Sequence, residues 1–233
     1  MSRVRVAAFC LSLDGYGAGP GQSLENPLGA GGEQLHTWVV QSPSWRRSQG
    51  LAVDDSGPSA DAALDDEVIR RAQEGIGATV MGRNMFGPVR GPWPDPAREP
   101  EWRGWWGEDP PFHHPVFVLT HHARPPLEMA GGTTFHFVTG GVHEALERAR
   151  CAAGGLDVRL GGGVDTIRQC LRQGLVDELQ LSVVPVLLGD GERLLGDLGD
   201  LPRYRAAGLR SSASAAHVTM VRDAAAGGSS GTR

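Results

Sequence analysis

The chain has 233 residues and a mass of 24.7 kDa, which allows one large domain, and its 40% content of hydrophobic residues is ample for a core. Its 22 basic residues, all arginine, are scattered and outnumbered by 27 acidic ones, so the formal net charge of −5 argues against a nucleic-acid partner. The absence of lysine excludes a Schiff-base lysine and the lysine of a P-loop.

The cysteines and the two ends of the sequence indicate the cellular compartment and the extent of the folded domain. Cys10, Cys151 and Cys170 are far apart, with neither a zinc-ligand nor a redox spacing, so free thiols in a reducing cytoplasm are expected. The apolar run near the N-terminus is brief and broken, so neither a signal peptide nor a membrane span is expected. The small polar residues 224–233 predict a disordered tail, and one domain is expected over residues 1–223.

The first quarter of the chain predicts a strand and a long loop. Residues 4–13 are rich in valine and small apolar residues, which indicates a buried first strand that ends at Asp14. Residues 15–59 are full of Gly, Pro and Ser, and loops of such length are usually functional. Within this loop, residues 32–40 predict a short helix that carries Trp38.

From residue 61 onward, predicted helices and strands alternate. A helix is expected over residues 61–75, because apolar residues recur every four positions before a glycine. Further helices are expected to begin at Arg83, to cover residues 142–155 and to carry Ile167, Cys170 and Leu171. Strands are expected over residues 78–82, 115–120, 134–139, 158–160, 177–188 and 216–222.

The order of these elements predicts the fold class. Strands alternate with helices until two strands follow each other at the end, which indicates a mostly parallel sheet, flanked by helices and closed by an antiparallel edge. The proline-rich residues 87–111 predict a surface loop. Its tryptophans, which either line a substrate cleft or form a cap or a dimer contact, are Trp93, Trp102, Trp105 and Trp106.

Gly161, Gly162 and Gly163 stand between a predicted strand and a predicted helix. Glycine lets main chain approach a ligand closely, and a helix N-terminus offers unpaired N–H groups, so this pattern predicts a bound phosphate. It is not the dinucleotide fingerprint, which needs a third glycine where Thr166 stands. A tight turn without a ligand is the alternative.

Two further strand ends carry groups that suit a phosphate. Gly82 and Arg83 follow one predicted strand, and Thr120, His121 and Arg124 follow the next. In open α/β sheets the carboxyl ends of the strands share one crevice. A ligand with several phosphates would therefore contact all three junctions.

Several segments of the chain carry a resemblance to a known family. They are "SLDGYGAGPGQSLENPLGAGGEQLHTW", "GATVMGRNMFG", "PPFHHPVFVLTHHAR", "RLGGGVDTIRQCL" and "LVDELQLSVVPVLLGDGERLL". In this order they resemble the dihydrofolate reductase family, and above all its bacterial members similar to the reductase domain of riboflavin biosynthesis. The resemblance covers residues 3–222 and implies a dihydrofolate reductase-like α/β fold. It also implies NADPH as cofactor and hydride transfer to a small heterocyclic substrate.

The resemblance implies cofactor contacts position by position. Ala8 matches the place where the nicotinamide amide meets main chain, and Leu13 and Gly15 begin the loop over that ring. Met85 stands where folate reductases commonly have a phosphate-binding threonine. The full set of expected cofactor-binding residues is Ala8, Leu13, Gly15, Gly82, Arg83, Asn84, Thr120, His121, Gly161, Gly162, Gly163, Val164, Asp165 and Thr166.

The expected catalytic residues are Asp14 and Glu67. Folate reductases hold the pterin with a carboxylate at the start of the second helix, and Asp66 and Glu67 match that place, although such an acidic run is typical of a solvated helix face. Asp14 precedes a glycine, which is first of all a turn signal. Riboflavin reductases often have a basic residue where this chain has Tyr16, which argues against a ribosyl-phosphate substrate.

The nearest named activity is 5-amino-6-(5-phosphoribosylamino)uracil reductase. Dihydrofolate reduction is one alternative, and a protein that binds a nucleotide or small molecule without turnover is another, because fold does not settle function. The expected partners are a small-molecule substrate and, as an open option, a second copy of the chain. No metal is expected, since adjacent histidines at positions 113–114 and 121–122 point to opposite faces of an extended chain.

Overall fold

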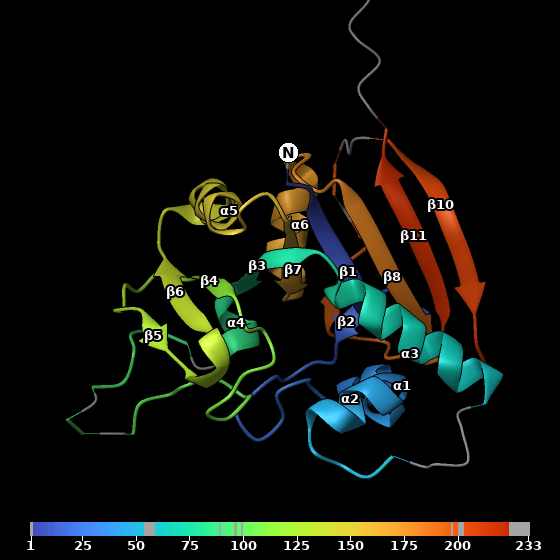
Figure 1. Ribbon diagram of the computed structural model, residues 1–233, viewed down its shortest axis with the longest axis horizontal. Helices are drawn as coiled ribbons and strands as arrows, with labels where there is room; N and C mark the ends of the chain where they lie inside the picture. The colour runs from blue at the N-terminus through green and yellow to red at the C-terminus, as the bar shows by residue number, and fades with distance from the viewer. Residues whose placement is uncertain are drawn as a thin grey trace, which may run out of the picture.

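Nine strands form one sheet in the part of the chain that the computed structural model describes, residues 2–53, 59–88, 90–95, 97–98, 100–196, 198–199 and 203–223 (Figure 1). In spatial order they are β10 (Tyr204–Ser211), β11 (Ala216–Arg222), β8 (Glu178–Val184), β1 (Val4–Ser12), β7 (Asp157–Gly162), β3 (Ile76–Gly82), β4 (Pro115–Leu119), β6 (Thr134–Val138) and β5 (Leu127–Glu128). The strands from β8 to β6 run parallel, whereas β10, β11 and β5 are antiparallel to their neighbours. The mostly parallel sheet with an antiparallel edge is therefore confirmed.

Helices cover both faces of this sheet. One face carries α5 (Gly141–Ala152) and α6 (Val164–Arg172), and α3 (Ala60–Gln73) crosses the other face over β1. Figure 1 shows α1 and α2 below α3, at the end of the sheet toward which β1 and β8 point. The shorter elements are η1 (Gly32–His36), α1 (Thr37–Gln41), α2 (Pro43–Ser48), α4 (Arg83–Phe86), η2 (Ala130–Gly132) and a small sheet of β2 (Tyr16–Ala18) with β9 (Glu192–Arg193).

The face under α5 and α6 holds the larger hydrophobic core. The buried side chains of these helices recur at three- and four-residue intervals, so each helix presents one apolar stripe to the sheet. They are Val142, Ala145, Leu146 and Ala149 on α5, and Val164, Ile167, Cys170 and Leu171 on α6. Full burial of a leucine or isoleucine side chain contributes about 1.5–3 kcal/mol. These stripes therefore fix the helix that follows the glycine loop.

A series of buried polar contacts holds α3 on the other face of the sheet, opposite α5 and α6. Asp65 Oδ1 of α3 lies 2.9 Å from His217 Nε2 of β11, and His217 Nδ1 lies 2.9 Å from Ser182 Oγ of β8. All three residues are buried, and the Trp38 ring of α1 meets the imidazole edge-on with ring centroids 5.0 Å apart. Buried polar groups need such partners, so this chain of contacts fixes α3 and α1 on the sheet.

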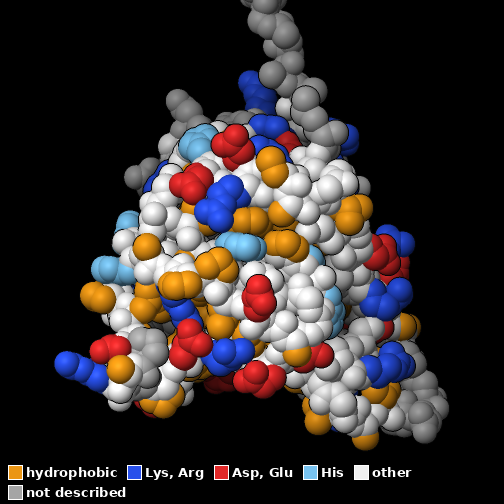
Figure 2. All heavy atoms as spheres, turned by 60° about the vertical axis from the view of Figure 1, so that its left-hand side comes forward, with side chains coloured by type: hydrophobic (Ala, Val, Ile, Leu, Met, Phe, Trp, Pro, Cys, Tyr) orange, Lys and Arg blue, Asp and Glu red, His pale blue; other side chains and the backbone are white. Residues whose placement is uncertain are grey.

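The tryptophan-rich loop forms a second apolar layer on this face. Trp93, Trp102 and Trp106 pack on the cluster around Phe86. The indole N–H of Trp93 donates to the carbonyl of His122 at 2.7 Å, and that of Trp102 donates to the carbonyl of Phe86 at 2.8 Å. Figure 2 shows hydrophobic side chains gathered on this side of the molecule, with basic and acidic side chains interspersed. The loop is thus a cover for the sheet.

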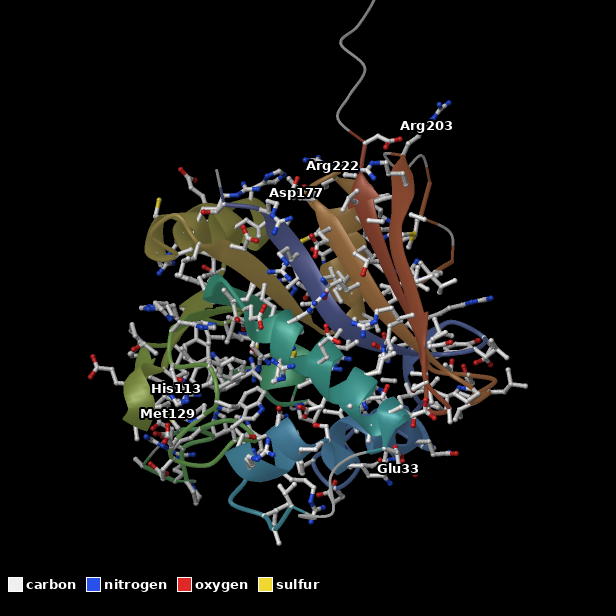
Figure 3. All side chains as sticks on the ribbon, turned by 45° about the vertical axis from the view of Figure 1, so that its right-hand side comes forward. Glu33, His113, Met129, Asp177, Arg203 and Arg222 are labelled. Atoms are coloured by element: carbon white, nitrogen blue, oxygen red, sulfur yellow. The ribbon has the colours of Figure 1, made fainter. Side chains whose placement is uncertain are left out.

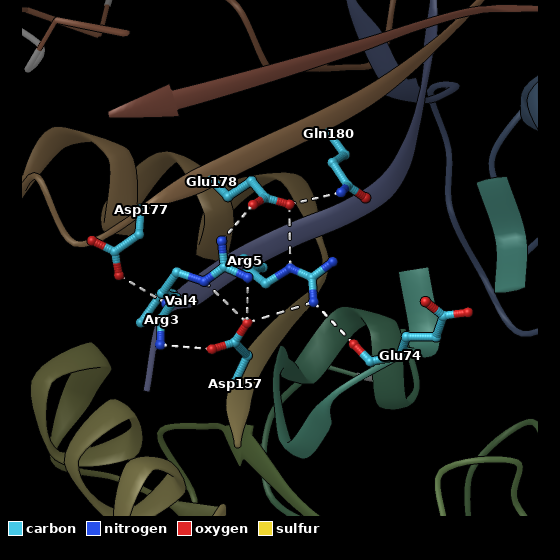
Figure 4. A network of polar contacts seen from close by, with 8 residues as sticks. All are labelled: Arg3, Val4, Arg5, Glu74, Asp157, Asp177, Glu178 and Gln180. Atoms are coloured by element: carbon cyan, nitrogen blue, oxygen red, sulfur yellow. Dashed lines mark hydrogen bonds and ion pairs between the residues drawn. The ribbon is translucent and has the colours of Figure 1, made fainter. Parts of the chain in front are cut away.

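Ion pairs close the end of the sheet where β1, β7 and β8 begin (Figure 4). Arg5 Nε lies 3.3 Å from Glu178 Oε1, and Arg3 Nη2 lies 2.9 Å from Asp157 Oδ2. Arg5 and Glu178 are both buried. The network joins the amino ends of three parallel strands and leaves their carboxyl ends for a site.

The structure differs from the sequence-based prediction mainly near the C-terminus. The strand expected to reach residue 188 ends at Val184, because Pro185 has no N–H group for the ladder. The pattern also misses β10, whose mostly exposed small and charged residues lack apolar alternation. The last strands of the large sheet are therefore three, β8, β10 and β11, and not the two that the sequence predicts. The expected tail at residues 224–233 lies outside the described residues.

Candidate functional site

A cavity of about 580 Å³ lies at the carboxyl ends of the parallel strands. Figure 3 shows Glu33 of η1 near this end of the molecule and Asp177 and Arg222 at the opposite end. The expected cofactor-binding residues that line the cavity are Gly82, Arg83, Asn84, Thr120, His121, Gly161, Gly162, Gly163, Val164, Asp165 and Thr166. The three strand-end junctions that the sequence singles out thus meet in one cavity.

The glycine loop forms the floor of the cavity. Gly162 has a φ of 128°, in the region that side chains rarely adopt, and the peptide bond from Gly162 to Gly163 is cis. A Cβ built on Gly163 would meet no atom within 4 Å, so this residue faces open space. Gly163 caps α6, and the first N–H groups of a helix have no partner inside it. The floor therefore offers bare main-chain donors at the positive end of a helix dipole.

Gly82 shows why a glycine ends β3. A Cβ at this position would lie 2.5 Å from Thr166 Oγ1 and 3.5 Å from the Gly163 nitrogen. The end of β3 therefore approaches the start of α6 more closely than any side chain permits. This contact sets the distance between the Arg83 junction and the glycine loop.

Arg83 carries the principal positive charge of the cavity wall. Its Nη1 donates to the Gly91 carbonyl and to Thr120 Oγ1, both at 3.3 Å, and its guanidinium carbon lies 3.3 Å from the centroid of the Trp93 ring. Burial, together with the nearby positive charge of Arg124, lowers the pKa of Arg83. Its Nε and Nη2 are buried without a hydrogen-bond partner among the described residues. Such donors favour an anion.

Arg124 supports this wall without lining the cavity. It donates through Nη1 to the carbonyl of Trp102 at 2.8 Å and pairs through Nη2 with Glu101 Oε1 at 2.7 Å. Its guanidinium lies 5.0 Å from the centroid of the Trp93 ring, on which Arg83 also stacks. The indole thus holds two guanidinium groups next to Thr120.

The opposite wall comes from the long loop after β1 and from the small sheet. Gly17, Ala18, Leu28 and His36 line it, and Glu192 of β9 pairs with Ala18 of β2. The loop places these residues because its glycines permit close turns: a Cβ on Gly19 would collide with the Ala30 carbonyl oxygen. Apart from Glu192, the residues named for this wall carry no fixed charge.

A hydrogen bond joins the long loop to α4 beside the cavity. Asn84 Nδ2 donates to Gln22 Oε1 at 3.0 Å, and Gln22 Nε2 donates to the Pro27 carbonyl at 2.8 Å. Both amides line the cavity. Asn84 thus reaches the site through its side chain, whereas Gly82 and Gly163 reach it through main chain.

Some expected cofactor-binding residues lie outside the cavity lining. Ala8 has a φ of 49° at a register shift of β1, and such a bulge re-aims the next side chain, so Phe9 lines the cavity instead. Leu13 is 65% exposed, and Gly15 lies in the turn after β1. The loop over the cavity is formed by later residues, among them Gly17.

Neither expected catalytic residue reaches the cavity. Asp14 binds the Ser12 hydroxyl at 2.5 Å and the Gly189 N–H at 2.7 Å, and these hydrogen bonds hold the pKa of its carboxyl at about 2. Glu67 pairs with Arg210 Nη2 at 2.7 Å across to β10, and this guanidinium lowers the pKa of Glu67. Both carboxylates therefore fasten the fold.

The two acids that precede Glu67 on α3 are engaged as well. Asp66 accepts from the Ser44 N–H at 2.6 Å and from the Ser44 hydroxyl at 2.9 Å, which joins α3 to α2. Asp65 binds His217, as described above. The acids at positions 65–67 thus connect α3 to β11, α2 and β10. The pattern of a helix face cannot predict these contacts, because the partner residues lie far away in sequence.

The sequence interpretation misses several cavity residues. His36 lies within a predicted short helix and within a segment that carries the family resemblance, but neither marks it as a cavity residue, because its place at the end of η1 depends on contacts far along the chain. Trp105 and Trp106 line the cavity, as one of the two interpretations of the tryptophan loop expects, while Trp93 and Trp102 belong to the cover. Met85 lines it beside the glycine loop.

The sequence matches the family model of the RibD C-terminal domain over residues 4–218. The chain belongs to this family. No curated protein sequence matches the chain at a significant level.

Solved structures similar to this family member show the same fold. A protein of Shewanella sp. PV-4 named for riboflavin biosynthesis has a TM-score of 0.57 at 23% identity, covering 96% of this chain and 100% of its own. A pyrimidine reductase-like protein from Corynebacterium diphtheriae has a TM-score of 0.51 at 14% identity, covering 96% of this chain and 92% of its own. The dihydrofolate reductase-like fold is confirmed.

A two-activity protein is similar over part of its length. It is the diaminohydroxyphosphoribosylaminopyrimidine deaminase/5-amino-6-(5-phosphoribosylamino)uracil reductase of Thermotoga maritima, with a TM-score of 0.51 at 13% identity. The match covers 95% of this chain and 57% of the Thermotoga chain. This family member therefore spans little more than half of that protein.

The described part of the chain offers neither a metal cluster nor a membrane-spanning helix. It contains no cluster of three or more His, Cys, Asp or Glu side chains placed to hold a metal ion. None of its helices combines the length and apolar character needed to cross a bilayer.

Proposed function

We propose that the chain is an NADPH-dependent reductase that acts on an aminouracil, with reduction of 5-amino-6-(5-phosphoribosylamino)uracil as the nearest named reaction. The observation that carries the proposal is Arg83, which lines a cavity floored by a bare glycine loop and whose guanidinium has two buried donors without a hydrogen-bond partner among the described residues. Family membership and the reductase named for the Thermotoga protein support the reaction class.

The residues of the cavity fit NADPH. The N-terminus of α6 and Gly163 would hold the pyrophosphate, and Arg83 with Thr120 would hold the 2′-phosphate. When bound, the cofactor supplies the hydride, and the protein supplies orientation and exclusion of water. The residues named for the Arg83 wall include no acid that would bind the free 2′-hydroxyl of the NADH ribose. The proposed enzyme therefore prefers NADPH to NADH.

Dihydrofolate is the weaker candidate substrate. Holding a pterin in the way of folate reductases needs a free carboxylate on α3, and Asp65, Asp66 and Glu67 are all bound to other elements. Freeing Asp65 would leave the buried His217 without this partner, which costs about 1–3 kcal/mol, and freeing Asp66 or Glu67 would undo their contacts with Ser44 or Arg210. For the same reason we assign no catalytic role to Asp14 or Glu67.

We also propose that the protein works in the cytoplasm as a homodimer without a nucleic-acid partner. Cys10, Cys151 and Cys170 are free, which suits a reducing compartment. The mixed surface charge and the formal net charge of −5 suit a small-molecule enzyme. Sedimentation equilibrium of the purified chain measures the assembly state directly.

The Gly163→Val variant tests the cofactor site. Gly163 has a φ of −71°, which valine tolerates, and its Cβ would enter open cavity space. We expect NADPH affinity to fall at least about tenfold by calorimetry, because the branched side chain occupies phosphate space. Gly208→Val on β10 is the matched control, since a Cβ there makes only ordinary contacts with Thr219.

Unchanged NADPH affinity in a folded Gly163→Val protein would remove the loop from the site, and equal affinity of the wild type for NADH and NADPH would remove the 2′-phosphate assignment. Steady NADPH oxidation on an aminouracil panel supports the reductase. Tight NADPH binding without turnover on any substrate would instead support the non-catalytic binder.

A further inference from the structure

Among the described residues, His36 is the one histidine on the loop-side wall of the cavity. It ends η1 and lies close to the backbone of Gly32, and Gly32 in turn lies close to Leu28 and Ala18 of the same wall. Its ring lines the cavity. The histidines that line the other wall, at positions 121 and 122, follow β4 on the side of Arg83. His36 therefore lies on the wall opposite Arg83 and Thr120, which are proposed to hold the 2′-phosphate.

The environment of the ring defines its hydrogen-bonding state. Nδ1 of His36 is buried and makes no hydrogen bond of acceptable geometry among the described residues. Burial lowers the pKa of His36, although the nearby Gly32 carbonyl partly opposes this effect. A carbonyl is an acceptor only, so we assign the single proton of the neutral ring to Nδ1, the buried nitrogen. With this assignment, Nε2 is the acceptor nitrogen of a side chain that lines the cavity.

The segment that carries His36 is rigid. Leu35 and Trp38, on either side of it, are 0% and 3% exposed. The Trp38 ring packs on His217, which is itself held by Asp65 and Ser182. A side chain placed on such an anchored segment presents its acceptor in a fixed position, which is what orientation of a substrate requires.

Other parts of the cavity lining suit a flat ring. Phe9, Met85, Trp105 and Trp106 line the cavity with aromatic and sulfur surface. Arg83 and Arg90 are the arginines among the described lining residues, and the Arg83 guanidinium is held at the Gly91 carbonyl on the other wall. A neutral heterocycle with N–H groups on its edge matches these surfaces better than an anion does.

We infer that His36 orients the substrate: its Nε2 accepts a hydrogen bond from an N–H group on the edge of a flat, neutral heterocycle. The inference rests on the proposed function and deepens it, because an aminouracil carries such N–H groups. His36 thereby takes the recognition role for which the α3 carboxylates are not free, and it does so as a contact residue that transfers no proton.

The test uses 5,6-diaminouracil as probe, titrated by calorimetry into the NADPH-bound chain. His36→Leu removes the acceptor and is expected to weaken probe binding at least about tenfold. His36→Gln keeps an acceptor oxygen and is expected to bind within about threefold of wild type. His143→Leu, on the exposed side of α5, is the matched control and is expected to bind as wild type does.

NADPH affinity is measured for every variant and is expected to stay unchanged, because His36 is not among the residues proposed to hold the phosphates. Should His36→Leu also lose NADPH, His36→Phe, which keeps the ring volume, takes its place. Probe binding equal to wild type in the acceptor-free variant, a His36→Gln protein as weak as His36→Leu, or no probe binding by wild type would each overturn the inference. Failure of wild type to bind NADPH would instead refute the proposed function.

Discussion

Asp14 stabilises the loop after β1 through hydrogen bonds. Its carboxylate accepts from the Ser12 hydroxyl and from the N–H groups of Leu188 and Gly189, so it joins the end of β1 to the segment after β8. We expect Asp14→Asn to lower the thermal midpoint at pH 7 and to leave NADPH affinity unchanged. Differential scanning calorimetry and a cofactor titration measure the two effects.

The pH dependence of this effect has a definite sign. The pKa of Asp14 is lowered from 3.8 to about 2 in the folded chain, so its stabilisation is fully present above about pH 4 and is lost as pH falls toward 2. The difference in midpoint between wild type and Asp14→Asn is expected to shrink over that interval. A difference that stays constant down to pH 2, or a loss of NADPH affinity in the variant, would contradict the fastening role.

At the scale of elements, α3 depends on one buried contact more than on its apolar stripe. Of its residues only Asp65 and Ala72 are buried, and Asp65 binds His217 of β11 at 2.9 Å. Asp65→Ala would leave the buried imidazole nitrogen without a partner. We expect unfolding free energy to fall by about 1–3 kcal/mol, measured by urea denaturation.

Asp61→Ala is the matched control on the same helix, because Asp61 is exposed in its first turn. Its urea midpoint is expected to stay close to that of wild type. Equal midpoints for Asp65→Ala and Asp61→Ala would mean that α3 is held by its apolar contacts alone. A selective loss in Asp65→Ala supports the view that the acids of α3 serve the fold.

For the whole molecule, local pattern predicts the central sheet well and its edges poorly. The strands at residues 4–12 and 78–82 are apolar and buried, so their composition alone marks them. β10 is exposed on most residues and takes its structure from pairing with β11. Such an edge strand is specified by its partner, which no local window contains.

In the candidate site, too, some residues are predictable from local sequence and others depend on distant partners. Gly82, Gly163 and Arg83 are recognisable because backbone geometry and charge tie these residue types to strand ends that share one crevice. His36 reaches the cavity only because the long loop turns back on itself and packs Trp38 on His217. The engaged carboxylates of Asp14 and Glu67 likewise depend on partners more than a hundred positions away.

The central claim is that this cavity couples NADPH to reduction of an aminouracil. The most direct test supplies NADPH deuterated at C4 of the nicotinamide, together with 5-amino-6-(5-phosphoribosylamino)uracil or its dephosphorylated form, and follows the label by mass spectrometry. We expect one deuterium per turnover to appear in the reduced product and Gly163→Val to slow its appearance. NADPH that binds tightly while neither substrate gains label would contradict the claim.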